Sequence, residues 1–295
     1  MAGLTPMMQQ YMETKKQYKD CILFYRLGDF YEMFFEDAIT ASRELEITLT
    51  GKDCGLEERA PMCGVPFHAV DGYLNRLVSK GYKVAICEQV EDPKLAKGIV
   101  KREVIRIVTP GTNLNTQALE ESKNNYLMCI ACFQNRIGVS IVDVTTGDFY
   151  MTEVEGLAKL QDEIYKYMPT EIICNDAFVM SGYDIEDLKG RLGMAVYTLE
   201  PWYFDDDGCR KCLMNHFKVN TLAGLGLEDF PSGMISAGAA MQYLLETQKT
   251  DLTHINHIIP YLASRFMLLD SSTRRNLELT ETLREKQKKG SLLWV

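Results

Sequence analysis

An aromatic residue and a carboxylate lie two positions apart in the segment 21–34. Phe30 and Glu32 follow a Gly-Asp pair that separates two runs rich in apolar and aromatic residues. Two such runs joined by a Gly-Asp pair favour a tight β-hairpin, because glycine supplies the positive φ of a primed turn. In that hairpin Phe30 and Glu32 would emerge on the same face, so an aromatic wedge and a hydrogen-bonding carboxylate would share one projecting tip.

The residues of this segment leave two other interpretations open. Asp29 could cap a helix, with Glu32 closing a capping box. We favour the hairpin, with a helix that begins near Glu36 and ends at Leu45. Periodicity alone also fits a plainer arrangement, in which Phe30 is a core residue and Glu32 a solvated one. A carboxylate is, moreover, the wrong charge for a nucleic-acid surface.

Common catalytic and metal-binding patterns are scarce in the sequence. It has no Gly-x4-Gly-Lys-Ser/Thr loop for nucleotide hydrolysis, no Ser/His/Asp ordering and no His-Glu-x-x-His motif. Two CxxC pairs are present, at Cys129/Cys132 and Cys209/Cys212. Cys129 and Cys132 would point to opposite faces of a strand, so we favour coincidence over a zinc site.

Length, composition and charge limit the class of protein. The 295 residues favour two domains, and their 46% apolar content is ordinary for a globular chain. No run of 18 apolar residues and no secretory signal is visible, so we expect a cytoplasmic protein without membrane contact. The net charge of −9 argues against a general polyanion binder. Residues 114–258 carry 10 basic and 21 acidic side chains, which suits a protein partner better than DNA.

The elements that would position the hairpin alternate between helix and strand. Thr5 as cap and Pro6 at the first helical position predict a helix at the start of the chain. After the hairpin and its helix we expect a strand over 47–50 and then a polar, Gly-containing loop that ends in Ala-Pro-Met-Cys-Gly-Val-Pro-Phe-His at 60–68. A helix over 71–80 and strands over 82–90 and 100–109 follow, which together predict an α/β domain.

Beyond a polar linker, three β runs joined by short turns predict a meander. They are followed by a helix, a strand, a second helix and a second strand, an order typical of a ribonuclease H-like fold. The predicted ranges are 126–133, 137–144 and 148–154 for the meander, then 156–168, 171–174, 185–192 and 195–199, with closing helices at 212–218 and 233–248. A strand over 266–272 and a helix over 273–289 come last. The sequence ends in apolar residues, so we expect it to stop inside a longer protein.

Several sequence blocks in one order resemble the MutS family. The family's opening is matched by residues 5–11 and by Phe-Tyr-Arg-Leu-Gly-Asp-Phe-Tyr-Glu-Met-Phe at 24–34. Further blocks are Pro-Met-Cys-Gly-Val-Pro-Phe-His-Ala at 61–69, Val-Ala-Ile-Cys-Glu-Gln at 84–89, Arg-Ile-Val-Thr-Pro-Gly-Thr at 106–112 and Leu-Asp-Ser-Ser-Thr-Arg-Arg-Asn-Leu-Glu at 269–278. Long blocks in a fixed order are more specific than any single short motif.

The resemblance implies a domain organisation and a role for the hairpin. It implies a mixed-sheet α/β mismatch-binding domain over 1–113, a linker over 114–125, a catalytically inert ribonuclease H-like connector over 126–258, and the truncated start of a helical core over 259–295. It further implies that Phe30 enters the DNA minor groove at a mispair and kinks the duplex, and that Glu32 contacts the base. A mispair has already lost pairing and stacking, so kinking costs less there than in perfect duplex.

Contacts to the DNA backbone and neighbouring groups are expected from side chains around these two residues. Five of them form the densest basic cluster of the first domain, although a solvated strand edge would explain them equally well; these are Lys94, Lys97, Lys101, Arg102 and Arg106. The candidates are Arg26, Asp29, Tyr31, Pro66, His68, Lys94, Lys97, Lys101, Arg102 and Arg106. The partners implied are mismatched double-stranded DNA, a MutL-type protein through the connector, and a second MutS copy in the full-length protein. No cofactor is expected in these residues, since ATP and Mg²⁺ belong to the full-length protein.

Two rival functions belong to other classes. A ribonuclease H-like fold often holds Mg²⁺ between carboxylates, and Asp143 and Asp148 are the acids available for a nuclease. The first meander strand has no acid, so we predict an inert scaffold. A non-catalytic protein-interaction module is the second rival, and the acidic middle segment favours it.

Overall fold

The structure is a computed structural model, and it describes residues 3–91, 98–113, 124–134, 136–265, 269–285 and 287–294. The chain divides into two units, which are described separately below. The first comprises residues 1–125 and 244–252, and the second comprises residues 126–243 and 253–295.

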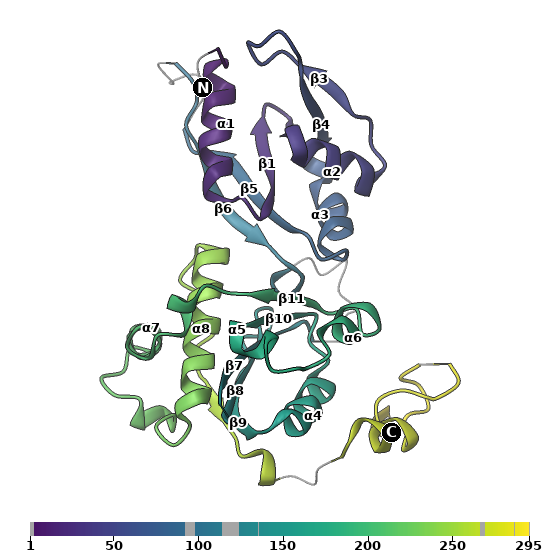
Figure 1. Ribbon diagram of the computed structural model, residues 1–295, viewed down its shortest axis with the longest axis vertical. Coiled ribbons are helices and arrows are strands. Elements are labelled where there is room, and N and C mark those ends of the chain that lie inside the picture. The colour runs from purple at the N-terminus through teal and green to yellow at the C-terminus, as the bar shows by residue number, and fades with distance from the viewer. Residues whose placement is uncertain are drawn as a thin grey trace. The chain divides into compact units, whose positions relative to one another are not determined.

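The first unit is built on a six-stranded mixed sheet with the order β3-β4-β2-β1-β5-β6 (Figure 1). β1 and β5 run parallel, and the other neighbours run antiparallel. β2 is therefore an interior strand, hydrogen-bonded to β1 on one side and to β4 on the other. The strands are β1 (Cys21–Leu27), β2 (Phe30–Phe34), β3 (Thr50–Lys52), β4 (Ala60–Pro66), β5 (Lys83–Gln89) and β6 (Arg102–Val108).

Helices cover both faces of this sheet. On one face α1 (Pro6–Gln17) contributes Met8 and Tyr11 to a core cluster that includes Phe34 of β2. On the other face α2 (Phe35–Leu45) and α3 (Val70–Val78) pack in a cluster that includes Tyr31 and Met33 of β2. Tyr31 and Met33 of β2 thus face one core and Phe34 faces the other, as the twofold period of a strand requires.

The predicted hairpin is confirmed, and two neighbouring predictions are wrong. β1 and β2 flank the turn Gly28-Asp29, in which Gly28 has a φ of 57°. The strand predicted at 47–50 lies at Thr50–Lys52 instead, and the predicted polar loop ends in the strand β4. β4 pairs with both β2 and β3. Such pairing depends on strands distant in sequence. It therefore stabilises a strand where the local prolines and glycines indicated a loop.

The first helix begins where the sequence predicts it but is capped differently. α1 begins at Pro6. Thr5 makes no side-chain cap, and among the described residues its buried hydroxyl has no hydrogen-bond partner. Its backbone N–H instead donates to the Cys54 carbonyl over 2.8 Å. A backbone bond to a distant segment therefore fixes the entry to this helix.

The second unit holds another six-stranded mixed sheet, with the order β11-β10-β7-β8-β9-β12. β7, β8 and β9 form the predicted antiparallel meander, while β10 and β11 continue the sheet in parallel with β7. The short strand β12, which the sequence did not predict, pairs in parallel with β9. The strands are β7 (Tyr126–Phe133), β8 (Arg136–Asp143), β9 (Phe149–Glu155), β10 (Glu171–Cys174), β11 (Ala195–Thr198) and β12 (Ile259–Pro260).

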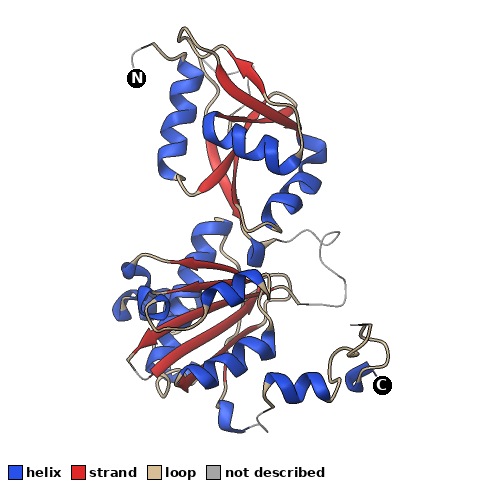
Figure 2. Cartoon of the chain, turned by 45° about the vertical axis from the view of Figure 1, so that its right-hand side comes forward, coloured by secondary structure: helices blue, strands red, loops and turns tan. Residues whose placement is uncertain are grey.

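Helices lie on both faces of this sheet as well (Figure 2). One core cluster joins the sheet to α4 (Leu157–Tyr167), α5 (Asp176–Val179) and α6 (Ile185–Gly190). On the opposite face, Ser236 of α8 (Pro231–Gln248) donates its hydroxyl to the Cys129 carbonyl over 2.8 Å. Helix α7 (Asp206–Phe217) packs against α8, where a Cβ at Gly238 would lie 2.3 Å from Cβ of Cys209. Helix α5 was not predicted.

The predicted helix over 273–289 is confirmed over 273–276 and wrong for the described residues beyond 276. The helix present is α9 (Ser271–Asn276), and Asp270 caps it by accepting the Thr273 N–H over 2.6 Å. Leu277 and Leu283 are exposed, so this segment lacks the packed apolar face that stabilises most helices. The predicted strand over 266–272 is wrong where it is described, because residues 269 and 270 are not in a strand and 271 and 272 belong to α9; the rest of it lies outside the described residues. Single 3-10 turns occur at Phe67–Ala69, Pro110–Thr112, Pro201–Phe204, Ala223–Leu225, Ala263–Arg265 and Leu292–Trp294.

Each helix within the described ranges is too short or insufficiently apolar to span a lipid bilayer.

Candidate functional site

The hairpin tip exposes one large apolar ring. Leu27 and Phe30 are paired directly across the turn, and the Phe30 side chain is 47% exposed. The next residue, Tyr31, is buried on the other face of the sheet. Glu32 returns to the face of Phe30 and is half-buried. The arrangement expected from the sequence, a wedge and a carboxylate on one face, is therefore present.

Strand β4 supports the tip from the side. Pro66 lies opposite Phe30 and Gly64 lies opposite Glu32. Beyond Pro66, the Phe67 N–H donates to the Asp29 carbonyl over 2.9 Å, so the turn is tied to the following 3-10 segment. The segment that contains Pro66, which the sequence predicts as a neighbour of Phe30 and Glu32, therefore contacts the hairpin tip directly.

Arg26 joins the turn to two neighbouring segments. Its Nε donates to the Gly28 carbonyl over 2.6 Å, and its Nη1 lies 3.5 Å from Oε1 of Glu88 on β5. The guanidinium lies over the Phe67 ring, with Cζ 3.8 Å from the centroid. The Tyr31 hydroxyl also donates to Glu88. Burial, and then this hydrogen bond to a carboxylate, raise the Tyr31 pKa, so the phenol stays protonated and the link stays intact.

Glu32 has a partner that the sequence did not indicate. Lys52 of β3 places Nζ in an ion pair with Oε2 of Glu32. The same ammonium lies 5.6 Å from the centroid of the Phe34 ring. The two charges are 20 positions apart in sequence and are brought together only by the pairing of β3, β4 and β2, so no local signal could have identified Lys52.

The basic side chains proposed for the DNA backbone have different environments. Lys101 is exposed and pairs with Glu103 at 2.6 Å. Arg102 donates to the Arg26 carbonyl over 2.7 Å, so it supports the strand that carries the tip. Arg106 donates to the Thr112 carbonyl over 2.8 Å, and burial lowers its pKa. Lys94 and Lys97 lie outside the described residues.

His68 is the last of the predicted neighbours. It is exposed beside Phe67, with ring centroids 5.9 Å apart in an edge-on arrangement. The structure thus places Arg26, Asp29 and Pro66 beside the hairpin tip, whereas Tyr31 is buried on the opposite face of the sheet and His68 contacts Phe67. Arg102 and Arg106 use their guanidinium groups in internal hydrogen bonds.

The acids considered for a nuclease take part in a turn of the second unit. Asp143 is fully buried, and its Oδ1 accepts the Thr145 N–H over 2.8 Å and the Thr145 hydroxyl over 2.5 Å. Asp148 accepts the Thr146 hydroxyl over 2.8 Å. Within the described part of the chain, no three His, Cys, Asp or Glu side chains are grouped so that they could hold a metal ion.

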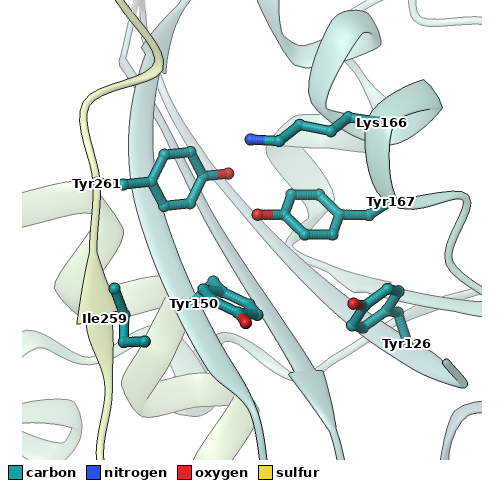
Figure 3. Close-up of a pocket in the computed structure, with 6 residues that line it drawn as sticks. All are labelled: Tyr126, Tyr150, Lys166, Tyr167, Ile259 and Tyr261. Atoms are coloured by element: carbon teal, nitrogen blue, oxygen red, sulfur yellow. The ribbon is translucent and has the colours of Figure 1, made fainter. Parts of the chain in front are cut away.

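The second unit also contains a pocket of about 370 Å³ (Figure 3). Four tyrosines, Lys166 and Ile259 line it, and none of them belongs to the residues predicted to contact DNA; the tyrosines are Tyr126, Tyr150, Tyr167 and Tyr261. The hydroxyls of Tyr167 and Tyr261 face each other in Figure 3. Lys166 lies 4.2 Å from the centroid of the Tyr261 ring and 3.4 Å from the buried carboxylate of Glu163. The Lys166 ammonium is therefore held beside Tyr261 and Glu163, at one side of the pocket.

Comparison with known proteins agrees with the division of the fold. The family model for MutS domain I matches residues 5–117, and that for MutS domain II matches residues 125–256. The DNA mismatch repair protein MutS of Lachnoclostridium phytofermentans is 68% identical over the whole chain, which covers 32% of that relative. Those of Ruminiclostridium cellulolyticum and Acetivibrio thermocellus are 57% and 55% identical over the whole chain, which covers 34% of each. The chain thus spans about a third of the length of these relatives, and it belongs to the MutS family.

Proposed function

We propose that this chain reads mispaired bases in double-stranded DNA, with Phe30 as the wedge and Glu32 as the base contact. The observation that carries the proposal is the Phe30 ring, 47% exposed at the tip of a two-residue turn while Tyr31 and Met33 beside it are buried. An exposed aromatic ring on a projecting turn can enter the minor groove and stack on a base. The mismatch repair proteins to which the chain is similar support this assignment.

Discrimination would come from the cost of deforming the duplex. Wedge residues kink DNA by roughly 20–90°, and unstacking a base step costs a few kcal/mol in perfect duplex. At a mispair part of the stacking energy is already lost, so the same kink costs less free energy there. Glu32 would accept a hydrogen bond from a base N–H, while its charge would disfavour close approach to an undistorted duplex.

The test is the affinity for a duplex with one G·T mispair or one unpaired base, against matched duplex at the same salt. Phe30→Ala should weaken binding to the mispair by about one to two orders of magnitude, because stacking a base on an aromatic ring is worth about 1–3 kcal/mol. Ile105→Ala is the matched control, since Ile105 of β6 is equally exposed. Normal mismatch binding by Phe30→Ala would refute the wedge.

Glu32 has its own expected signature. Glu32→Ala should raise the affinity for matched duplex relative to mismatched duplex, because it removes a repulsive charge and a base contact together. Both substitutions are best measured in this chain and, at the matched positions, in a full-length protein of the family. An unchanged ratio of the two affinities would show that Glu32 does not discriminate.

We further propose that the second unit connects mismatch binding to protein partners. Residues 114–258 carry 10 basic and 21 acidic side chains, which favours a protein surface over a DNA surface. The partners expected are a MutL-type protein, a second copy of the longer protein and an ATP-hydrolysing part outside these residues. Titration of this chain with the MutL protein of the same organism tests the first of these, and salt-insensitive or absent binding would contradict an electrostatic interface.

A further inference from the structure

The Glu32 carboxylate meets a cation across the neighbouring strand. Lys52 of β3 pairs with Oε2 of Glu32, although β4 lies between their strands. Gly64, the β4 residue opposite Glu32, has no side chain, and a Cβ there would lie in ordinary contact with Cγ of Glu32 at 3.5 Å. The pair is only partly covered, with the Lys52 side chain 32% and the Glu32 side chain 16% exposed. A duplex that approaches Phe30 therefore meets the ion pair and not a bare carboxylate.

We propose that Lys52 is a specificity-determining residue, because it sets how much of the Glu32 charge a DNA duplex encounters. This inference rests on the proposed role of Glu32 as the base contact. A partly exposed ion pair is weak enough to exchange partners. At a mispair, Glu32 exchanges the ammonium for a base N–H, and Lys52 is released toward the DNA backbone.

On matched duplex no such exchange is available, so the pair stays closed. Lys52 then cancels the charge that would repel the phosphates, and the carboxylate rejects perfect duplex less than it would alone. Removing the ammonium should therefore weaken matched binding more than mismatched binding. Lys52 would thus lower the preference for mismatched over matched duplex, while it raises the affinity for DNA overall.

A double-mutant cycle tests the proposal. Dissociation constants for G·T and matched duplexes of one sequence are measured for the unaltered chain, Lys52→Met, Glu32→Gln and the double variant. Lys52→Met should raise the ratio of matched to mismatched dissociation constants by about two- to fivefold, the range that coupling within an exposed ion pair supplies. In the Glu32→Gln background the same substitution should leave the ratio unchanged.

Lys80→Met is the matched control. Lys80 pairs with Glu44 at 3.0 Å, and it lies near the end of the sheet where Cys21 pairs with Lys83, opposite the hairpin tip. The substitution removes the same charge, so it should weaken both duplexes equally. Lys52→Gln serves as a second variant if Lys52→Met fails to reach the thermal stability of the unaltered chain.

The outcomes are separable from those of the proposed function. Lys52→Met could instead weaken binding to both duplexes equally in both backgrounds and reduce the salt slope of binding by about one. That result would make Lys52 a simple phosphate contact and overturn the inference. No change in either affinity would overturn it as well. If Phe30→Ala keeps its mismatch preference, the proposed function fails; if Phe30→Ala loses it while Lys52→Met leaves the ratio unchanged, only the role of Lys52 fails. The cycle is run with this chain and, at matched positions, with a full-length protein of the family.

Discussion

The Arg26 guanidinium lies over the Phe67 ring, with Cζ 3.8 Å from its centroid, beside the turn that precedes Phe30. Arg26 also donates to the Gly28 carbonyl over 2.6 Å. One side chain thus holds the turn through a hydrogen bond and the adjacent 3-10 segment through a cation–π contact. A lysine could keep the charge but not the planar fork that makes both contacts at once.

Arg26→Lys should therefore lower the free energy of unfolding of the chain by about 1–2 kcal/mol. Urea unfolding followed by circular dichroism measures it. Arg43→Lys is the control, because Arg43 is 69% exposed and pairs with its neighbour Glu44 on the surface. Equal destabilisation by the two substitutions would mean that Arg26 contributes only a surface charge.

Gly138→Ala should destabilise the second unit by about 3 kcal/mol or more. A Cβ at Gly138 of β8 would lie 1.8 Å from the carbonyl oxygen of Ser232 in α8, and a backbone atom cannot rotate away. Gly190→Ala in α6 is the control, since a Cβ there meets nothing within 4 Å. Thermal unfolding of the two variants gives the comparison, and similar melting temperatures would contradict the close approach of α8 to β8.

Asp143→Ala should cost about 1–3 kcal/mol of stability, because it removes the buried carboxylate that accepts hydrogen bonds from the N–H and the hydroxyl of the exposed Thr145. Asp148→Ala removes one hydroxyl contact at the same turn and should cost less. If Asp143 serves a turn and not a metal, incubation of the unaltered chain with Mg²⁺ and DNA should give no cleavage. Mg²⁺-dependent cleavage that Asp143→Ala abolishes would restore the nuclease alternative.

Alkaline pH should destabilise the folded chain. Burial raises the pKa of Cys63 to about 12 and that of Cys87 to about 12. An unfolded cysteine ionises near pH 8.5, so above that pH the unfolded state loses protons that the folded state keeps. The stability contributed is fully present below about pH 8.5 and falls as the pH rises toward 12, by at most about 1.4 kcal/mol per pH unit for each thiol.

Urea unfolding at pH 8 and pH 10 in the presence of reductant measures this slope. Cys87→Ala removes one of the raised pKa values and should make the decline shallower. A decline of equal steepness in Cys87→Ala would assign the alkaline sensitivity to other groups.

The hairpin could be predicted because its determinants are local. Gly28 supplies the positive φ of the turn, and alternation in β2 places Phe30 and Glu32 on one face. The pairing of β4 with two distant strands leaves no such local trace, so β4 was mistaken for a loop and Lys52 was missed. The helix predicted over 273–289 failed for the opposite reason: its local pattern is helical, but outside α9 its apolar side chains find no surface to pack against.

The interior position of β2 has a mechanical consequence. The strand that carries Phe30 pairs with Tyr25, Arg26 and Leu27 of β1 on one side and with residues 62–66 of β4 on the other. A force on the backbone of Phe30 is therefore shared by two ladders of hydrogen bonds and by the apolar layers on both faces of the sheet. When the hairpin tip binds a flexible polymer, we therefore expect the polymer to deform and the strand to keep its shape.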